Sequence, residues 1–160
     1  MGRYTCATFA LLLAVSCTTP SALRTDTEAY VGRMSSWAPV EAETARTLER
    51  ILATQFVDAA EVLRQIGDSS PRVQRHLEEI TQYQPRTPEL RRIHDAYTGA
   101  WRTLLDGYAS IDRGLARNDQ VLLAAGRQSL LQWRTSILGV ARQLRDLSDR
   151  VGLPATSPGH

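Results

Sequence analysis

The chain has 160 residues, with 19 basic residues, all of them arginine, against 17 acidic ones, and a formal net charge of +2. This balance excludes the strong basic excess of most nucleic-acid-binding domains and the one-sided acidity of a disordered acidic tail. An apolar fraction of 42% is enough for the core of one modest domain.

The first apolar segment reads CATFALLLAV, from Cys6 to Val15, and follows Arg3. It has about 10 residues, whereas a helix that spans a bilayer needs roughly 20. A charged start, a short apolar run and small residues after it are typical of a cleavable export leader. An uncleaved membrane anchor stays open as an alternative, because no charged residue occurs from Tyr4 to Leu23.

The leader ends in Ala14-Val15-Ser16-Cys17, which resembles the lipobox of bacterial lipoproteins. The resemblance covers residues 1–17 only. It implies that the leader, residues 1–16, is removed and that acyl chains are attached to Cys17, which becomes the first residue of the mature chain. Ala14 stands where the family usually has leucine, and Ala14-x-Ser16 also fits an ordinary secretory cleavage site, so this second outcome remains open.

The cysteine count favours lipid attachment. Once Cys6 is removed with the leader, Cys17 is the single cysteine of the mature chain, so an internal disulfide is impossible. Thr18 follows it, not the aspartate that keeps many such lipoproteins at the inner membrane. The resemblance therefore implies a lipid anchor in the bacterial cell envelope, with the outer membrane favoured.

Residues 17–24 are expected to form a lipidated tether, 25–152 a helical domain and 153–160 a flexible tail. Thr25-x-x-Glu28 has the pattern of a capping box and predicts that the first helix begins there. Pro39 either kinks this helix or divides it, and one kinked helix over 25–67 is favoured. Its apolar stripe ends at Gly67, and a shorter helix is expected from Ser70-Pro71 to just before Pro85.

The two later segments have clearer helical patterns. Thr87 and Pro88 predict the start of a helix whose inward side carries the small residues Ala100, Gly107 and Gly114. Asn118 or Asp119 is expected to cap the last helix, which Gly152 and Pro154 end. Its heptad rows are Leu123, Leu130, Ile137, Leu144 and Val151, and Gly126, Trp133, Val140 and Leu147.

We expect Leu122, Leu131 and Leu138 to widen this stripe towards two neighbouring helices. No segment shows the alternation of a strand. The sequence therefore predicts an all-α fold, a three- or four-helix antiparallel up-down bundle.

Residues for catalysis or metal binding are sparse. The sequence lacks a His-Glu-x-x-His pair, a glycine-rich phosphate loop and a Glu-x-x-His motif. His76 with Glu79, or His94 with Asp95, offers only a pair of potential ligands on one helix. A haem held between Met34 and His94 is a weaker alternative. We therefore expect no cofactor, no metal and no catalytic residue, and a lowered pKa if His94 is buried.

Five aromatic residues, Trp37, Tyr97, Trp101, Tyr108 and Trp133, are expected to face inward. Tyr83 lies in the connector YQPRTP and is harder to place in a core. Together with Arg86 it is the candidate contact for a partner.

The functional hypothesis is a lipid-anchored, non-enzymatic binding or scaffolding protein of the bacterial envelope. It would be held at the membrane through Cys17 and would contact another envelope protein, in a surface, adhesion or motility complex, without binding nucleic acid. An alternative is a carrier or chaperone that holds a lipid or hydrophobic peptide in a groove beside Gly107 and Gly114. A haem- or metal-binding bundle is less favoured.

Overall fold

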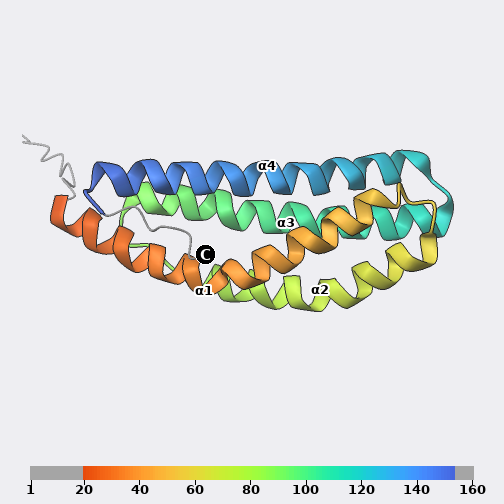
Figure 1. Cartoon of the computed structure of the whole chain (residues 1–160), viewed down its shortest axis with the longest axis horizontal. Coiled ribbons are helices and arrows are strands. Elements are labelled where there is room, and N and C mark those ends of the chain that lie inside the picture. The colour runs from red at the N-terminus through yellow and green to blue at the C-terminus, as the bar shows by residue number, and fades with distance from the viewer. Residues whose placement is uncertain (1–19, 154–160) are drawn as a thin grey trace, which may run out of the picture.

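The computed structural model describes residues 20–153, with side chains from residue 22, and shows four α-helices. They are α1 (Pro20–Ala53), α2 (Ala59–Gln82), α3 (Pro88–Arg117) and α4 (Gln120–Arg150). Consecutive helices run in opposite directions along one long bundle (Figure 1). The predicted all-α antiparallel bundle is therefore confirmed, in its four-helix form. The leader, Cys17 and most of the predicted tail lie outside the described residues.

The first helix starts earlier than the sequence predicts. α1 begins at Pro20, so Thr25 and Glu28 lie inside it and the predicted capping box is wrong as a helix start. Residues 20–24 of the expected tether are helical. Thr25 therefore has helical residues on both sides and does not act as an N-cap.

α1 continues through Pro39 as a single helix, as the sequence favoured. Proline inside a helix removes one backbone hydrogen bond and its ring collides with the carbonyl group four residues earlier. Such sites are common causes of helix bends, and Figure 1 shows α1 changing direction about halfway along its length. The bend lets the second half of α1 follow α2.

The predicted boundaries between residues 45 and 71 are wrong. α1 ends at Ala53, and α2 runs without interruption through Gly67, Ser70 and Pro71 to Gln82. The turn contains Gln55 and Phe56 with φ of 49° and 60°, a left-handed conformation that side chains other than glycine adopt rarely. Asp58 then caps α2, because its carboxylate accepts a hydrogen bond from the Glu61 amide at 3.0 Å.

The caps of α3 and α4 agree with the sequence. Thr87 precedes Pro88 at the start of α3, although its hydroxyl does not cap the helix and has another partner. Asn118 ends α3 in the left-handed conformation, and Asp119 caps α4 by accepting from the amides of Val121 and Leu122. This short turn makes α3 and α4 antiparallel neighbours.

Small residues bring α3 and α4 close together. A Cβ atom added to Gly126 would lie 2.5 Å from Cγ1 of Ile111 and 3.0 Å from the carbonyl oxygen of Gly107. One added to Gly107 would lie 2.9 Å from the Cβ of Ser129, and one at Gly114 would meet Leu123 at 2.9 Å. These three glycines therefore lie where the helices touch backbone to side chain, as close-packed interiors require.

The heptad positions of α4 fill most of the core on its side. Leu123, Leu130, Trp133, Val140, Leu144 and Leu147 are all buried. Leu131 and Leu138, however, are 40% and 57% exposed, so the prediction that they widen the buried stripe is wrong. α4 packs on α3 and α1 with one face, and these two leucines lie on the other.

Candidate functional site

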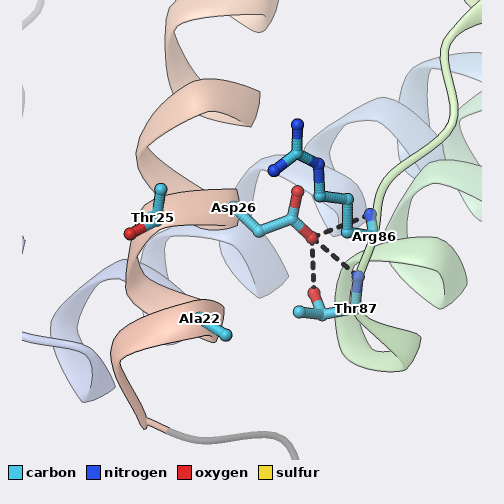
Figure 2. A pocket seen from close by; sticks show the side chains of 5 residues that line it. All are labelled: Ala22, Thr25, Asp26, Arg86 and Thr87. Atoms are coloured by element: carbon cyan, nitrogen blue, oxygen red, sulfur yellow. Dashed lines mark hydrogen bonds between the residues drawn. The ribbon is translucent and has the colours of Figure 1, made fainter.

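The most elaborate polar arrangement lies where α1 begins, near the connector between α2 and α3. Asp26 on α1 is buried, and its Oδ2 atom accepts three hydrogen bonds from the connector. The donors are the amide of Arg86 at 2.9 Å, the amide of Thr87 at 2.7 Å and the hydroxyl of Thr87 at 2.7 Å (Figure 2). A carboxylate here also favours the N-terminus of α3, where unpaired N–H groups carry partial positive charge.

A pocket of about 270 Å³ lies beside this contact, lined by Ala22, Thr25, Asp26, Arg86 and Thr87. Figure 2 shows the Asp26 carboxylate of α1 pointing towards Arg86 and Thr87 of the connector. All three hydrogen bonds to Oδ2 of Asp26 come from the protein's own connector. The contact joins segments 60 residues apart and closes this end of the bundle.

Next to this contact, aromatic and histidine rings from α1, α2, α3 and the connector form one cluster. We call it the aromatic end; it comprises Tyr30, Trp37, His76, Tyr83, His94, Tyr97 and Trp101. Trp37 stacks on Tyr97 with centroids 5.7 Å apart and an interplanar angle of 12°, while most other pairs meet edge to face. Such pairs add to the free energy of burying their area.

A chain of hydrogen bonds crosses this cluster. The Tyr97 hydroxyl donates to Oε1 of Glu41 at 2.6 Å, so its oxygen is free to accept from Nε2 of His76, 3.1 Å away. With its proton on Nε2, His76 has an unprotonated Nδ1, and that atom is buried without a partner. The network links α1, α2 and α3 through three titratable side chains.

Burial shifts the pKa of each of these groups away from its charged form. Desolvation lowers the pKa of His76, although the Coulombic effect of Glu79 opposes the shift. It raises the pKa of Glu41, against the hydrogen bond from Tyr97, and it raises the pKa of Tyr97. All three groups are therefore shifted towards their neutral forms.

His94 is a second buried histidine of this end. Its Nδ1 atom lies 3.2 Å from the Tyr30 hydroxyl, and the ring also bonds to the backbone of Ile80 and Tyr83. Desolvation lowers its pKa, the direction expected from the sequence for a buried site. These contacts link the His94 ring of α3 to α1 and to the C-terminal end of α2.

The two residues proposed as a partner contact lie in different environments. The Arg86 side chain is exposed while its backbone binds Asp26. Tyr83, which the sequence placed outside the core, is half-buried, with its ring 5.6 Å from that of Tyr30. The guanidinium of Arg33 lies over the Tyr83 ring, 5.8 Å from its centroid, a cation–π distance, so one face of this aromatic ring is covered by α1.

The candidate ligand pairs make separate contacts. Glu79 accepts a hydrogen bond from the Trp37 indole at 2.9 Å, while His76 binds Tyr97. Within the described part of the chain, no cluster of three or more histidine, cysteine, aspartate or glutamate side chains is placed to hold a metal ion. Met34 packs against the core, and Nδ1 of His94 lies 3.2 Å from the Tyr30 hydroxyl.

The groove that the carrier alternative requires beside Gly107 and Gly114 is filled. Ser129, Leu130 and Leu123 of α4 occupy the space in front of these two glycines. This face of α3 is therefore a helix–helix contact.

Comparison with protein-family models, with curated proteins and with solved structures gives no match for this chain. Among residues 20–153, no helix has the length and apolar character to cross a bilayer.

Sequence reasoning missed Asp26 and Glu41, the two carboxylates that organise this end. Both lie on α1 among other polar residues, and each finds its partners 56 or more residues further along the chain. One indirect signal for Asp26 was present in the sequence: the N–H groups just before the helix that starts at Pro88 need an acceptor. Glu41 carried no such signal.

Proposed function

We propose that this protein is a lipid-anchored, non-enzymatic component of the bacterial envelope that works by binding another envelope protein. The observation that carries the proposal is the resemblance of Ala14-Val15-Ser16-Cys17 to a lipobox, with Cys17 three residues before Pro20, the first described residue of α1. Two or more acyl chains on a terminal cysteine hold a protein stably at a bilayer. Because Cys17 is so close to Pro20, the bundle would stay near the membrane surface, with the outer membrane favoured by Thr18.

The interior of the bundle supports a binding role over a chemical one. The buried polar groups of the aromatic end bind each other across helices, and this fixes the relative positions of α1, α2 and α3. Hydrogen bonds between buried side chains on different helices favour a fixed arrangement of those helices. A rigid body near a membrane suits the presentation of its outer surface to a partner, and Arg86 with the half-buried Tyr83 is the first contact to test.

The test has two arms. In the first, Cys17→Ser should abolish incorporation of labelled fatty acid and move the protein from the membrane to the soluble fraction. In the second, a photo-crosslinking amino acid at Arg86 should give one discrete adduct in intact cells, whereas the same group at Arg113, exposed near the far end of α3, should give none.

Continued membrane pelleting of Cys17→Ser would favour an uncleaved leader as the anchor and overturn the lipid proposal. Equal crosslinking from positions 86 and 113 would mean that the connector is not a specific contact for a partner. The two results are independent, because the anchor and the contact are tested by different substitutions.

A further inference from the structure

One exposed line of side chains on α4 combines arginines with leucines. Steps of four and three residues along α4 place successive side chains on one face of the helix. From Arg127 these steps lead through four exposed arginines and two exposed leucines: Arg127, Leu131, Arg134, Leu138, Arg142 and Arg145. We call these six residues the Arg–Leu stripe. It is about 27 Å long at 1.5 Å per residue.

The charge of the stripe has one sign. Between Gln120 and Arg145 there are four arginines and no aspartate or glutamate. In the described part of the chain the ion pairs are those of Arg64 with Glu61 and Asp68, and of Arg72 with Glu43, all on α1 and α2. None of the four stripe arginines has a hydrogen-bond or ion-pair partner there. Positive charge and apolar surface are therefore both presented to the outside.

This pattern needs an anionic partner with an apolar interior. A second copy of the chain is disfavoured, because pairing two stripes would bring arginines against arginines with no carboxylate between them. A bilayer with anionic headgroups meets both requirements. Guanidinium groups bind phosphate oxygens bidentately, and the long arginine stems let the leucines enter the boundary between headgroups and acyl chains.

The position of α4 also favours the bilayer. α1 begins beside the C-terminal end of α4 (Figure 1). A Cβ atom added to Gly152, just after α4, would lie 4.0 Å from Nη1 of Arg24 on α1. Three residues from Cys17 to Pro20 can span at most about 10 Å. A lipid on Cys17 would thus hold one end of the bundle, and with it one end of α4, close to the headgroups.

From these observations we infer that the Arg–Leu stripe of α4 docks on an anionic lipid surface and lays the bundle along the membrane. The orientation rests on the proposed lipid anchor, but the affinity of the stripe for anionic lipid does not require it. Docking would leave α2 and the opposite flank of the bundle directed away from the bilayer and accessible to an envelope protein.

The test uses the full chain with Cys17→Ser, so that acyl chains contribute nothing to binding. Its sedimentation is measured with vesicles of phosphatidylcholine alone and of phosphatidylcholine mixed with phosphatidylglycerol. We expect binding to the mixed vesicles only, weakened by salt because the attraction is between charges near a surface. Any leader residues retained on the chain are identical in every variant, so differences between variants report the stripe.

Two double substitutions separate charge from apolar contact. Arg127→Gln with Arg134→Gln should weaken binding to the mixed vesicles about tenfold or more, since each arginine near an anionic surface contributes a severalfold increase in affinity. Leu131→Ser with Leu138→Ser should also weaken it, with less dependence on salt. The matched control, Arg75→Gln with Leu63→Ser on exposed positions of α2, should bind like the parent.

Equal binding to both kinds of vesicle, or parent-like binding by both stripe variants, would overturn the inference. So would a concentration-dependent dimer in solution that the leucine substitutions dissolve, because it would assign the stripe to a second copy. All of these positions are exposed, and unchanged thermal melting of the variants verifies that the bundle is intact. A failure of acyl labelling at Cys17 would overturn the anchor without altering these measurements.

Discussion

At the end of the bundle where α3 turns into α4, the helices are held by shape: Gly107, Gly114 and Gly126 leave room only for Ile111, Leu123 and their neighbours. At the opposite end, rings and carboxylates from α1, α2, α3 and the connector are held by directed hydrogen bonds. The packing of the first end is therefore sensitive to side-chain volume and should depend little on pH. The second is sensitive to protonation, because burial disfavours the charged forms of its groups.

The largest expected effect tests the apolar seam of α4 itself. Leu130, 1% exposed, packs against the line of α3 that contains Gly107. Leu130→Asp buries a carboxylate without a partner, which should cost more than about 4 kcal/mol and abolish cooperative unfolding. Circular dichroism during heating provides the measurement.

The adjacent residue gives the matched control for this substitution. Leu131→Asp introduces the same carboxylate at a position that is 40% exposed, so the melting temperature should change by only a few degrees. Similar melting of the two variants would mean that the heptad seam is not the buried side of α4.

A glycine pair on α4 tests whether shape holds this end. Gly126→Ala places a methyl group 2.5 Å from Ile111 and should lower the free energy of unfolding by about 2 kcal/mol. Gly139→Ala on the same helix meets nothing within 4 Å and should raise it by about 0.5–1 kcal/mol, because alanine favours helix. Chemical denaturation measures both, and a stabilising Gly126→Ala would refute close packing.

The smallest effect, a dependence on pH, should come from the aromatic end. The pKa values of His76 and His94 are lowered in the folded state, so below about pH 6.5 the unfolded chain binds protons that the folded chain does not. Their contribution to stability therefore falls as the pH drops below that value. Glu41, whose pKa is raised, acts in the opposite sense closer to its ordinary value of 4.5, because its protonated form favours the fold.

We accordingly expect the melting temperature to fall by several degrees between pH 7 and pH 5. Replacing both histidines with phenylalanine should flatten this change even if stability at pH 7 is reduced. Gly126→Ala should keep the slope of the parent and lower the whole curve. If the melting temperature of the histidine variant changed with pH as much as that of the parent, the pH dependence would arise outside the aromatic end.

The two halves of the chain also differ in how far the sequence predicts them. α3 and α4 could be predicted because their heptad rows, the Pro88 start and the Asp119 cap agree with each other. α1 and α2 could not, because Gly67 and Pro71 suggest a break that tertiary packing overrides. The real turn carries its left-handed residues at Gln55 and Phe56, where local preference gives no warning.

The same reason limits prediction of the site. Inward-facing Trp37, Tyr97 and Trp101 follow from helical spacing and are confirmed as buried. The partners of Asp26 and Glu41 do not follow, since a hydrogen bond between residues 56 or more apart depends on the final register of the helices. Leu131 and Leu138 were misplaced because an apolar residue next to a seam fits a second helix or an open face equally well.

The three hydrogen bonds between Asp26 and the connector bear on how the bundle would transmit a mechanical load. Under the proposed lipid anchor on Cys17, any load on the protein would enter the bundle through the N-terminal end of α1. That load reaches the three hydrogen bonds of Asp26 before it reaches the rings deeper along the helix. The Asp26 carboxylate would then pass part of this load from α1 to the connector between α2 and α3.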